Sequence, residues 1–126
     1  MGFGDTEDKS YENLRKSKRI DYYAKIYCTK YTANGETKDL EKPLELILLN
    51  ISTVGLGIIS ETSFEIGTVL VLNIKLEEKN YQKVSARVIW NIKKGDMYRQ
   101  GLEIINISGK LFTHLGKLDN SITATV

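Results

Sequence analysis

Two short stretches of this sequence carry the residues best suited to bind a small anion. In RKSKR (15–19), Arg15 and Arg19 lie four positions apart, and a guanidinium group can pair with a phosphate or stack on a purine. In NISTVG (50–55), Asn50 and Ser52 lie two positions apart, so that their side chains project to the same side of an extended chain. The two stretches together predict a site that combines cationic groups with fixed hydrogen-bonding groups.

The second stretch also has a simpler interpretation as a turn. Asn and Ser favour turns, and a glycine supplies a positive φ angle, which accounts well for Gly55. It accounts less well for Asn50 and Ser52, because a turn does not require two polar side chains at this spacing at the end of an apolar strand. The amide of Asn50 offers a donor and an acceptor and Ser52 adds a hydroxyl, so we interpret both residues as ligand-binding groups.

The charge balance limits the kind of anion. The chain has 18 Lys and Arg against 16 Asp and Glu, a formal net charge of +2. Proteins that bind bulk nucleic acid carry a wide basic surface, so we expect a small, locally held anion and no bulk nucleic acid.

Nothing in the sequence indicates catalysis or a metal site. The chain has one cysteine, Cys28, and one histidine, His114, which excludes an intrachain disulfide and a multi-cysteine metal site. No serine or cysteine is placed to form a nucleophile pair with His114, and no phosphate-binding glycine loop opens a helix. We therefore expect no enzyme, no catalytic residue, no metal and no cofactor. We interpret Cys28 as a buried, apolar packing residue.

The sequence shows neither of the signals expected for membrane insertion or secretion. No apolar stretch approaches the roughly 20 residues that a membrane-spanning helix needs, and the first 13 residues are polar and acidic, unlike a signal peptide. With a single cysteine, the expected location is the cytoplasm.

Alternation of apolar and polar residues predicts an all-β fold. An Asn-Gly pair (34–35) indicates a hairpin, Pro43 is expected at an edge or a bulge, and Gly67 at a positive φ. The tail has a helical apolar face formed by Leu111, Phe112, Leu115 and Leu118. The expected strands are 20–31, 39–49, 55–60, 68–77, 81–92 and 97–105. Six such strands with short turns predict a closed or nearly closed antiparallel barrel with a short C-terminal helix.

The fifth expected strand has a clear inward face. Strict alternation over 81–92 assigns to it Val84, Ala86, Val88, Trp90 and Ile92. Trp90 is accordingly interpreted as a core residue, and Gly101 as a position of close packing.

The two polar stretches in this order resemble the signature of the PilZ domain family, RxxxR followed by [D/N]xSxxG. RKSKR and NISTVG match it at all five defining positions. Two segments further on, VSARVIW and QGLEI, also resemble the family's valine-and-tryptophan strand and its glycine-led last strand. The resemblance covers roughly residues 11–115.

The resemblance implies a non-catalytic receptor for the bacterial second messenger cyclic di-GMP on a PilZ-type six-stranded barrel. Arg15 and Arg19 would contact phosphates and guanine, Asn50 and Ser52 would hydrogen-bond the base, and Gly55 would keep the turn tight. Many family members carry an arginine directly before the first motif arginine, where this chain has Leu14. Leu14 is therefore a possible apolar ligand contact, and one ligand molecule per site is expected.

The resemblance also implies a domain organisation and a way of signalling, and two other functions remain as alternatives. Residues 1–13 are expected to form a flexible lead, 14–118 a single PilZ domain, and 119–126 a C-terminal tail. The receptor would signal when ligand orders the lead, which a downstream protein partner then recognises. One alternative is a PilZ-like interaction module without nucleotide binding. The other is a small barrel that binds RNA or single strands by stacking on Tyr22, Tyr23 and Tyr27.

Overall fold

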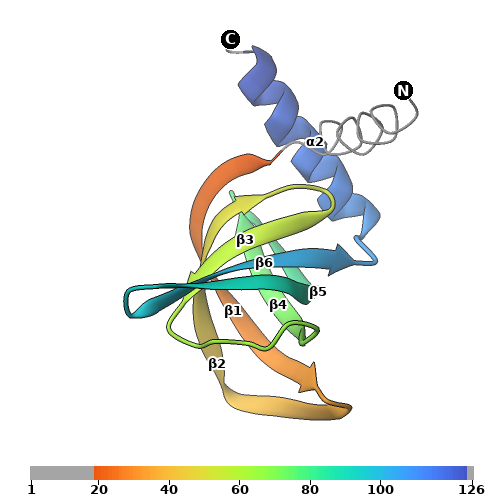
Figure 1. The fold of residues 1–126 in the computed structure, drawn as a ribbon. Helices are drawn as coiled ribbons and strands as arrows, with labels where there is room; N and C mark the ends of the chain where they lie inside the picture. The colour runs from red at the N-terminus through yellow and green to blue at the C-terminus, as the bar shows by residue number, and fades with distance from the viewer. Residues whose placement is uncertain (1–18, 125–126) are drawn as a thin grey trace, which may run out of the picture.

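Within residues 19–124, six antiparallel strands close into a barrel, and one helix lies at one end of it (Figure 1). The computed structural model describes residues 19–124, with side chains as far as Asp119; the predicted flexible lead, Leu14 and Arg15 lie outside these residues. The neighbouring strands around the barrel are β1-β2-β3-β6-β5-β4. The elements are β1 (Ile20–Ala33), β2 (Glu36–Ile51), β3 (Gly55–Ser60), β4 (Val69–Leu76), β5 (Lys79–Lys94), β6 (Met97–Ile105) and α2 (Gly109–Ala124). The predicted all-β barrel with a C-terminal helix is confirmed.

Turn residues set the boundaries of the strands. Asn34 and Gly35 have φ angles of 54° and 79°, the left-handed conformations that a tight hairpin between β1 and β2 requires. Gly67, before β4, has a φ of 98°, as predicted. The β1–β2 pairing shifts between Cys28↔Leu44 and Lys30↔Asp39. Pro43 lies inside this irregularity, where its missing N–H breaks no ladder.

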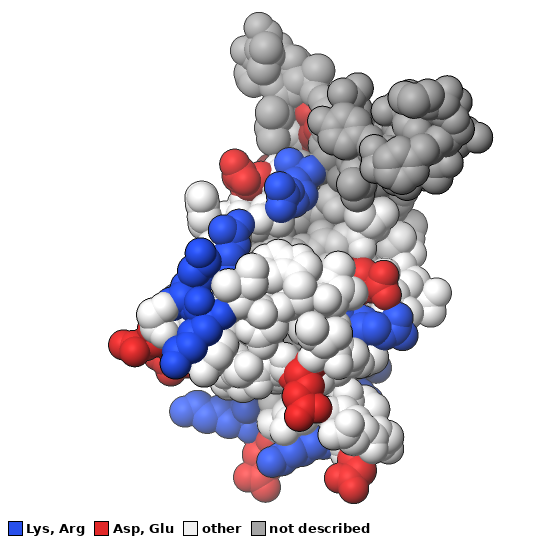
Figure 2. Space-filling view, in the orientation of Figure 1, with Lys and Arg blue, Asp and Glu red and all other residues white. Residues whose placement is uncertain are grey.

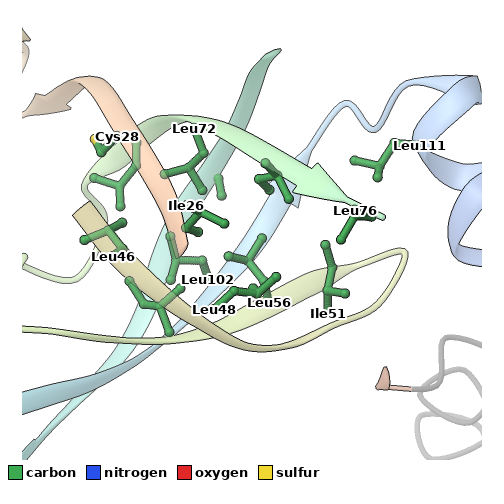
Figure 3. Packing of buried hydrophobic residues seen from close by; sticks show 14 of the residues in the cluster. Ile26, Cys28, Leu46, Leu48, Ile51, Leu56, Leu72, Leu76, Leu102 and Leu111 are labelled. Atoms are coloured by element: carbon green, nitrogen blue, oxygen red, sulfur yellow. The ribbon is translucent and has the colours of Figure 1, made fainter. Parts of the chain in front are cut away.

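The core fills the inside of the barrel with the inward side chains of all six strands. Figure 3 shows the inward residues pointing toward one another, with Leu111 of α2 approaching Leu76 at one end. Cys28 is fully buried among them, and burial raises the pKa of its thiol to about 11. A thiol that stays protonated is a packing residue rather than a nucleophile.

Helix α2 closes this end of the core, with one correction to its predicted face. Leu111 and Leu115 are buried and Leu118 packs against the core. Phe112, which was assigned to the same face, is 54% exposed, because a residue next to Leu111 is turned about 100° away from it on a helix. No helix within residues 19–124 is both long and apolar enough to cross a bilayer.

Strand β5 does not keep the strict alternation that its sequence predicts. Val88 pairs with Leu102 but Trp90 pairs with Gly101, so one extra residue is inserted between them. After this bulge the outward and inward positions are exchanged relative to simple alternation. Ile92 is 51% exposed, so its assignment to the core was wrong, and Trp90 is only partly buried.

One fully buried polar side chain holds the long β3–β4 connection against the barrel. Gln100 Oε1 accepts from the backbone N–H of Phe64 and from the Asn91 amide, both at 3.1 Å, and Gln100 Nε2 donates to the carbonyl of Thr62 at 3.0 Å. Each polar group of the buried amide is thereby satisfied.

Candidate functional site

The pairing of β1 with β2 brings Arg19, the last residue of RKSKR, beside the second motif. Ile20 lies opposite Ile51, and Asp21 lies opposite Asn50. Arg19 directly precedes Ile20, and Ser52 directly follows Ile51, so Arg19 and Ser52 lie at the same end of the two strands. Arg19 is exposed, so its guanidinium group is free to reach a ligand beside the second motif.

Asn50 lies on the outer wall of the barrel, against a glycine of the neighbouring strand. Its Cα partner is Gly57, which stands between the inward residues Leu56 and Ile58 and therefore faces outward. A Cβ atom built on Gly57 would lie 2.9 Å from both Oδ1 and Nδ2 of Asn50. The amide thus lies flat across Gly57, and Asn50 is only 7% exposed.

Ser52 holds the turn between β2 and β3. Its Oγ accepts the backbone N–H groups of Val54 and Gly55, both at 3.2 Å, and its own N–H donates to the carbonyl of Gly55 at 2.8 Å. The same hydroxyl donates only weakly to that carbonyl, at 3.4 Å. The geometry gives Ser52 a turn-forming role, and the predicted hydrogen bond to a base stays a prediction.

The position of Gly55 requires a residue without a side chain because of close packing, not because of a positive φ angle. The positive-φ glycines among the described residues are Gly35, Gly67 and Gly95, and Gly55 is not one of them. A Cβ at Gly55 would overlap the backbone carbonyl oxygen of Leu102 on β6. Gly55 therefore lets β3 approach β6 closely, which fixes the end of the motif on the barrel.

Sequence reasoning missed part of this outer surface. Gly57 is paired with Gly101, and Gly101 with Trp90. Gly101 also stands between inward residues, Gln100 and Leu102, and a Cβ there would overlap the indole of Trp90. The Trp90 ring therefore lies on the outside of the barrel across Gly101, which confirms Gly101 as a close-packing position and corrects the assignment of Trp90 to the core.

Four neighbouring strands thus contribute one continuous surface row, Asn50–Gly57–Gly101–Trp90. The two glycines let an amide and an indole lie flat on adjacent strands. Glycine in the middle of a strand often marks such a close approach, and this is the signal in GLGI and QGLE that could have revealed the row.

An ion pair borders the motif turn. Glu103 is the Cα partner of Gly55 on one side and of Arg87 on the other, and Arg87 Nη1 lies 2.8 Å from Glu103 Oε1. Both side chains are about half exposed, so the pair adds little stability. It does neutralise the Glu103 carboxylate beside the motif turn, which lowers the repulsion that an anion would meet there.

Comparison with known proteins agrees with this geometry. The sequence pattern of the PilZ domain matches residues 13–118. The chain belongs to the PilZ domain family. Among solved structures, this PilZ domain is similar to the Bacillus subtilis inhibitor of motility (MotI/DgrA), with a TM-score of 0.63 and 22% sequence identity over 89% of this chain and 51% of the other. It is also similar to the PilZ domain of Escherichia coli YcgR, solved with c-di-GMP, with a TM-score of 0.59 and 16% identity over 88% of this chain and 92% of the other.

This PilZ domain spans about half the length of the Bacillus protein. Both likenesses are below 25% identity and therefore show the fold. No curated protein matches the chain significantly.

A second polar cluster joins the helix to the barrel of this PilZ domain. His114 Nε2 lies 2.6 Å from Glu77 Oε1, and Nδ1 lies 2.6 Å from the hydroxyl of Tyr81. Since an ionised carboxylate only accepts, Nε2 carries a proton and donates to Glu77, while Nδ1 and the Tyr81 hydroxyl share the second hydrogen bond. The backbone N–H of Glu77 donates to the hydroxyl of Tyr22 on β1 at 2.6 Å. Burial, together with the Glu77 carboxylate, raises the pKa of Tyr81, which keeps its hydroxyl able to donate.

This cluster borders a groove that the motif residues do not line. The groove has a volume of about 830 Å³ and is lined by His114, Tyr81, Glu77 and the lysines 79, 110 and 117, among others. Asn50 lies instead on the outer wall of the barrel, with Arg19 directly before β1 and Ser52 in the turn between β2 and β3. Within residues 19–124 no three His, Cys, Asp or Glu side chains are grouped to hold a metal ion.

His114→Ala is expected to lower the free energy of unfolding by about 1–2 kcal/mol, because two hydrogen bonds are lost, one to Glu77 in the β4–β5 turn and one to Tyr81 on β5. The affinity of the motif site for its ligand should not change. Chemical denaturation of both proteins measures the first effect and calorimetry the second. Thr113→Ala, an exposed neighbour on the same helix, is the matched control. A loss of ligand affinity in His114→Ala alone would instead place the histidine in the binding site.

Proposed function

We propose that this PilZ domain is a non-catalytic receptor that binds cyclic di-GMP on the outer wall of its barrel. The observation that carries the proposal is the pairing of Ile20 with Ile51, which puts the end of RKSKR beside the start of NISTVG. The PilZ domain of YcgR, which shares the fold, was solved with c-di-GMP. A cyclic dinucleotide carries two phosphodiester charges, which the two motif arginines can balance without a strongly basic protein.

The chemistry of each group suits a guanine nucleotide. The guanidinium of Arg19 or Arg15 can donate in a fork to N7 and O6 of guanine or pair with a phosphate. The Asn50 amide offers a donor and an acceptor to a base edge. The indole of Trp90, on the same surface row, offers an apolar wall for a base. Ser52 and Gly55 shape the turn that presents Asn50, and Leu14 would make an apolar contact that favours one ligand molecule per site.

Signalling would follow from ordering of the N-terminal lead. Ligand bound between Arg15, Arg19 and the barrel wall would pin residues before β1 against the surface. The combined surface of lead and ligand would then be read by a downstream protein in the bacterial cytoplasm, where the messenger acts.

Calorimetric titration with cyclic di-GMP tests the proposal. We expect saturable binding with a stoichiometry near one ligand per chain and no binding of cyclic di-AMP or GTP under the same conditions. Two ligands per chain would contradict the role given to Leu14. Absence of binding would reject the receptor and favour a PilZ-type interaction module, which the family match also supports.

The RNA-binding alternative has less support from the residues it needs. Tyr22, one of its three stacking groups, has its hydroxyl engaged by the backbone of Glu77 and is only partly exposed. Salt-dependent RNA binding together with no cyclic di-GMP binding would favour it.

A further inference from the structure

A row of large apolar side chains crosses the outside of the barrel next to the motif surface. The Cα pairings Lys25↔Ile47, Ile47↔Ile59, Ile59↔Arg99 and Arg99↔Ile92 place five residues side by side on β1, β2, β3, β6 and β5. We call Lys25, Ile47, Ile59, Arg99 and Ile92 the isoleucine row. The row faces outward because the residues on each side of Ile47 and of Ile59 are buried in the core or the barrel interior.

Two of the three isoleucines in this row are exposed to solvent, and Ile59, which lies between them, is partly buried. Ile47 is 37% and Ile92 51% exposed, and on β1 the outward Tyr23 and Tyr27 extend the apolar surface with 76% and 40% exposure. Single exposed apolar residues are common, but neighbouring ones on adjacent strands form a patch, and patches mark binding surfaces. In an isolated barrel, nothing in the core requires isoleucine at these positions.

Cations lie along one edge of the patch (Figure 2). Lys25 and Arg99 belong to the row itself, and Lys93 and Lys94 follow Ile92 directly on β5. Figure 2 shows Lys and Arg side chains gathered along one edge of a broad uncharged area over β3 and β6. The acidic neighbour Glu45 lies 3.8 Å from Lys25, but both are well exposed, so this contact leaves Lys25 available.

We propose that the isoleucine row docks an acidic protein segment. Apolar side chains of the segment would cover Ile47, Ile59 and Ile92, and its carboxylates would pair with Lys25 and Arg99. Charge complementarity favours this occupant. In a two-fold contact between copies of this chain, the row would bury Lys25 and Arg99 without offering them a carboxylate of its own.

The position of the row gives a partner access to the motif surface. Ile59, Arg99 and Ile92 each lie two residues along their strands from Gly57, Gly101 and Trp90, on the same outer face. A segment docked on the row would therefore lie beside any ligand held at Asn50 and Trp90. Docking itself does not require the ligand, so this inference stands or falls independently of the proposed function.

Two labelled peptides test the inference on the full chain. They carry the same leucines at helical spacing, but one has glutamates and the other lysines at the flanking positions. We expect fluorescence anisotropy to give a dissociation constant on the order of 10–100 µM for the glutamate peptide, as for a small transient interface, and at least about tenfold weaker binding of the lysine peptide. Ile92→Glu and Arg99→Glu should each weaken the glutamate peptide at least about fivefold.

Phe112→Glu is the control, because Phe112 is as exposed as Ile92 but lies on α2; it should leave peptide binding unchanged. Thermal melts of each variant establish that the barrel is intact. Equal binding of both peptides, or binding of neither, would overturn the proposal. So would a dimer, seen by light scattering, that Ile92→Glu dissociates, or binding to anionic lipid vesicles in preference to the glutamate peptide.

Discussion

Arg19→Ala is expected to weaken cyclic di-GMP binding roughly 10- to 100-fold, because a charge-assisted contact to a phosphate or to guanine contributes about 1.5–3 kcal/mol. The melting temperature of the free protein should stay within about 1–2 °C of the parent value, because surface substitutions that disturb no partner change stability little. Arg19 is exposed directly before β1, and it takes part in none of the ion pairs within residues 19–124. Calorimetry and a thermal melt on the same preparations measure both effects. Arg15→Ala, at a position outside the described residues, should behave in the same way.

Two further variants separate the shape of the arginine from its charge. Arg19→Lys keeps the charge but loses the planar fork, so it should recover only part of the affinity. Lys38→Ala removes an exposed cation from the β1–β2 hairpin, and ligand binding should not change. Unchanged affinity in both Arg19→Ala and Arg15→Ala would refute the site. If Arg19→Lys bound the ligand as tightly as the parent protein, only the positive charge at position 19 would matter, and not the planar guanidinium group.

The barrel could be predicted because its signals are local and repeated. Alternation in β1 specifies a buried and an exposed face, the Asn-Gly pair specifies the first hairpin, and Gly67 specifies the turn before β4. The closeness of Arg19 to NISTVG also follows from sequence order, once β1 and β2 are antiparallel neighbours. These features depend on residues that stand next to one another in the chain or across one hairpin.

The outer surface row could not be predicted in the same way, because it depends on a bulge and on contacts across four strands. One extra residue between Val88 and Trp90 reverses the facing of everything after it, and a period-two pattern carries no mark of that insertion. Trp90 and Ile92 are apolar and were therefore assigned to the core, although both positions face outward. Ser52 differs, because the interpretation of NISTVG as a turn already assigns a serine at this position to a turn, and the hydrogen bonds of Ser52 agree with it.

The two motif-side glycines differ in what an added methyl group would meet, and this makes Gly55→Ala the strongest test of the turn. Its Cβ would overlap the carbonyl oxygen of Leu102, which is fixed in the ladder between β3 and β6. Because backbone cannot move aside as a side chain can, we expect Gly55→Ala to lower the free energy of unfolding by about 3 kcal/mol or more. For a domain of this size that corresponds to a melting temperature lower by roughly 12 °C or more.

Gly57→Ala and Gly116→Ala complete the comparison. At Gly57 the methyl group would meet the end of the Asn50 side chain, which can rotate away, so that ligand affinity should fall more than stability does. At Gly116, within α2, nothing lies within 4 Å of the added carbon, and alanine should stabilise the helix by about 0.5–1 kcal/mol. If Gly55→Ala melts like the parent protein, β3 and β6 do not approach as closely as the structure places them. Gly55 would then be needed, if at all, for the ligand rather than for the fold.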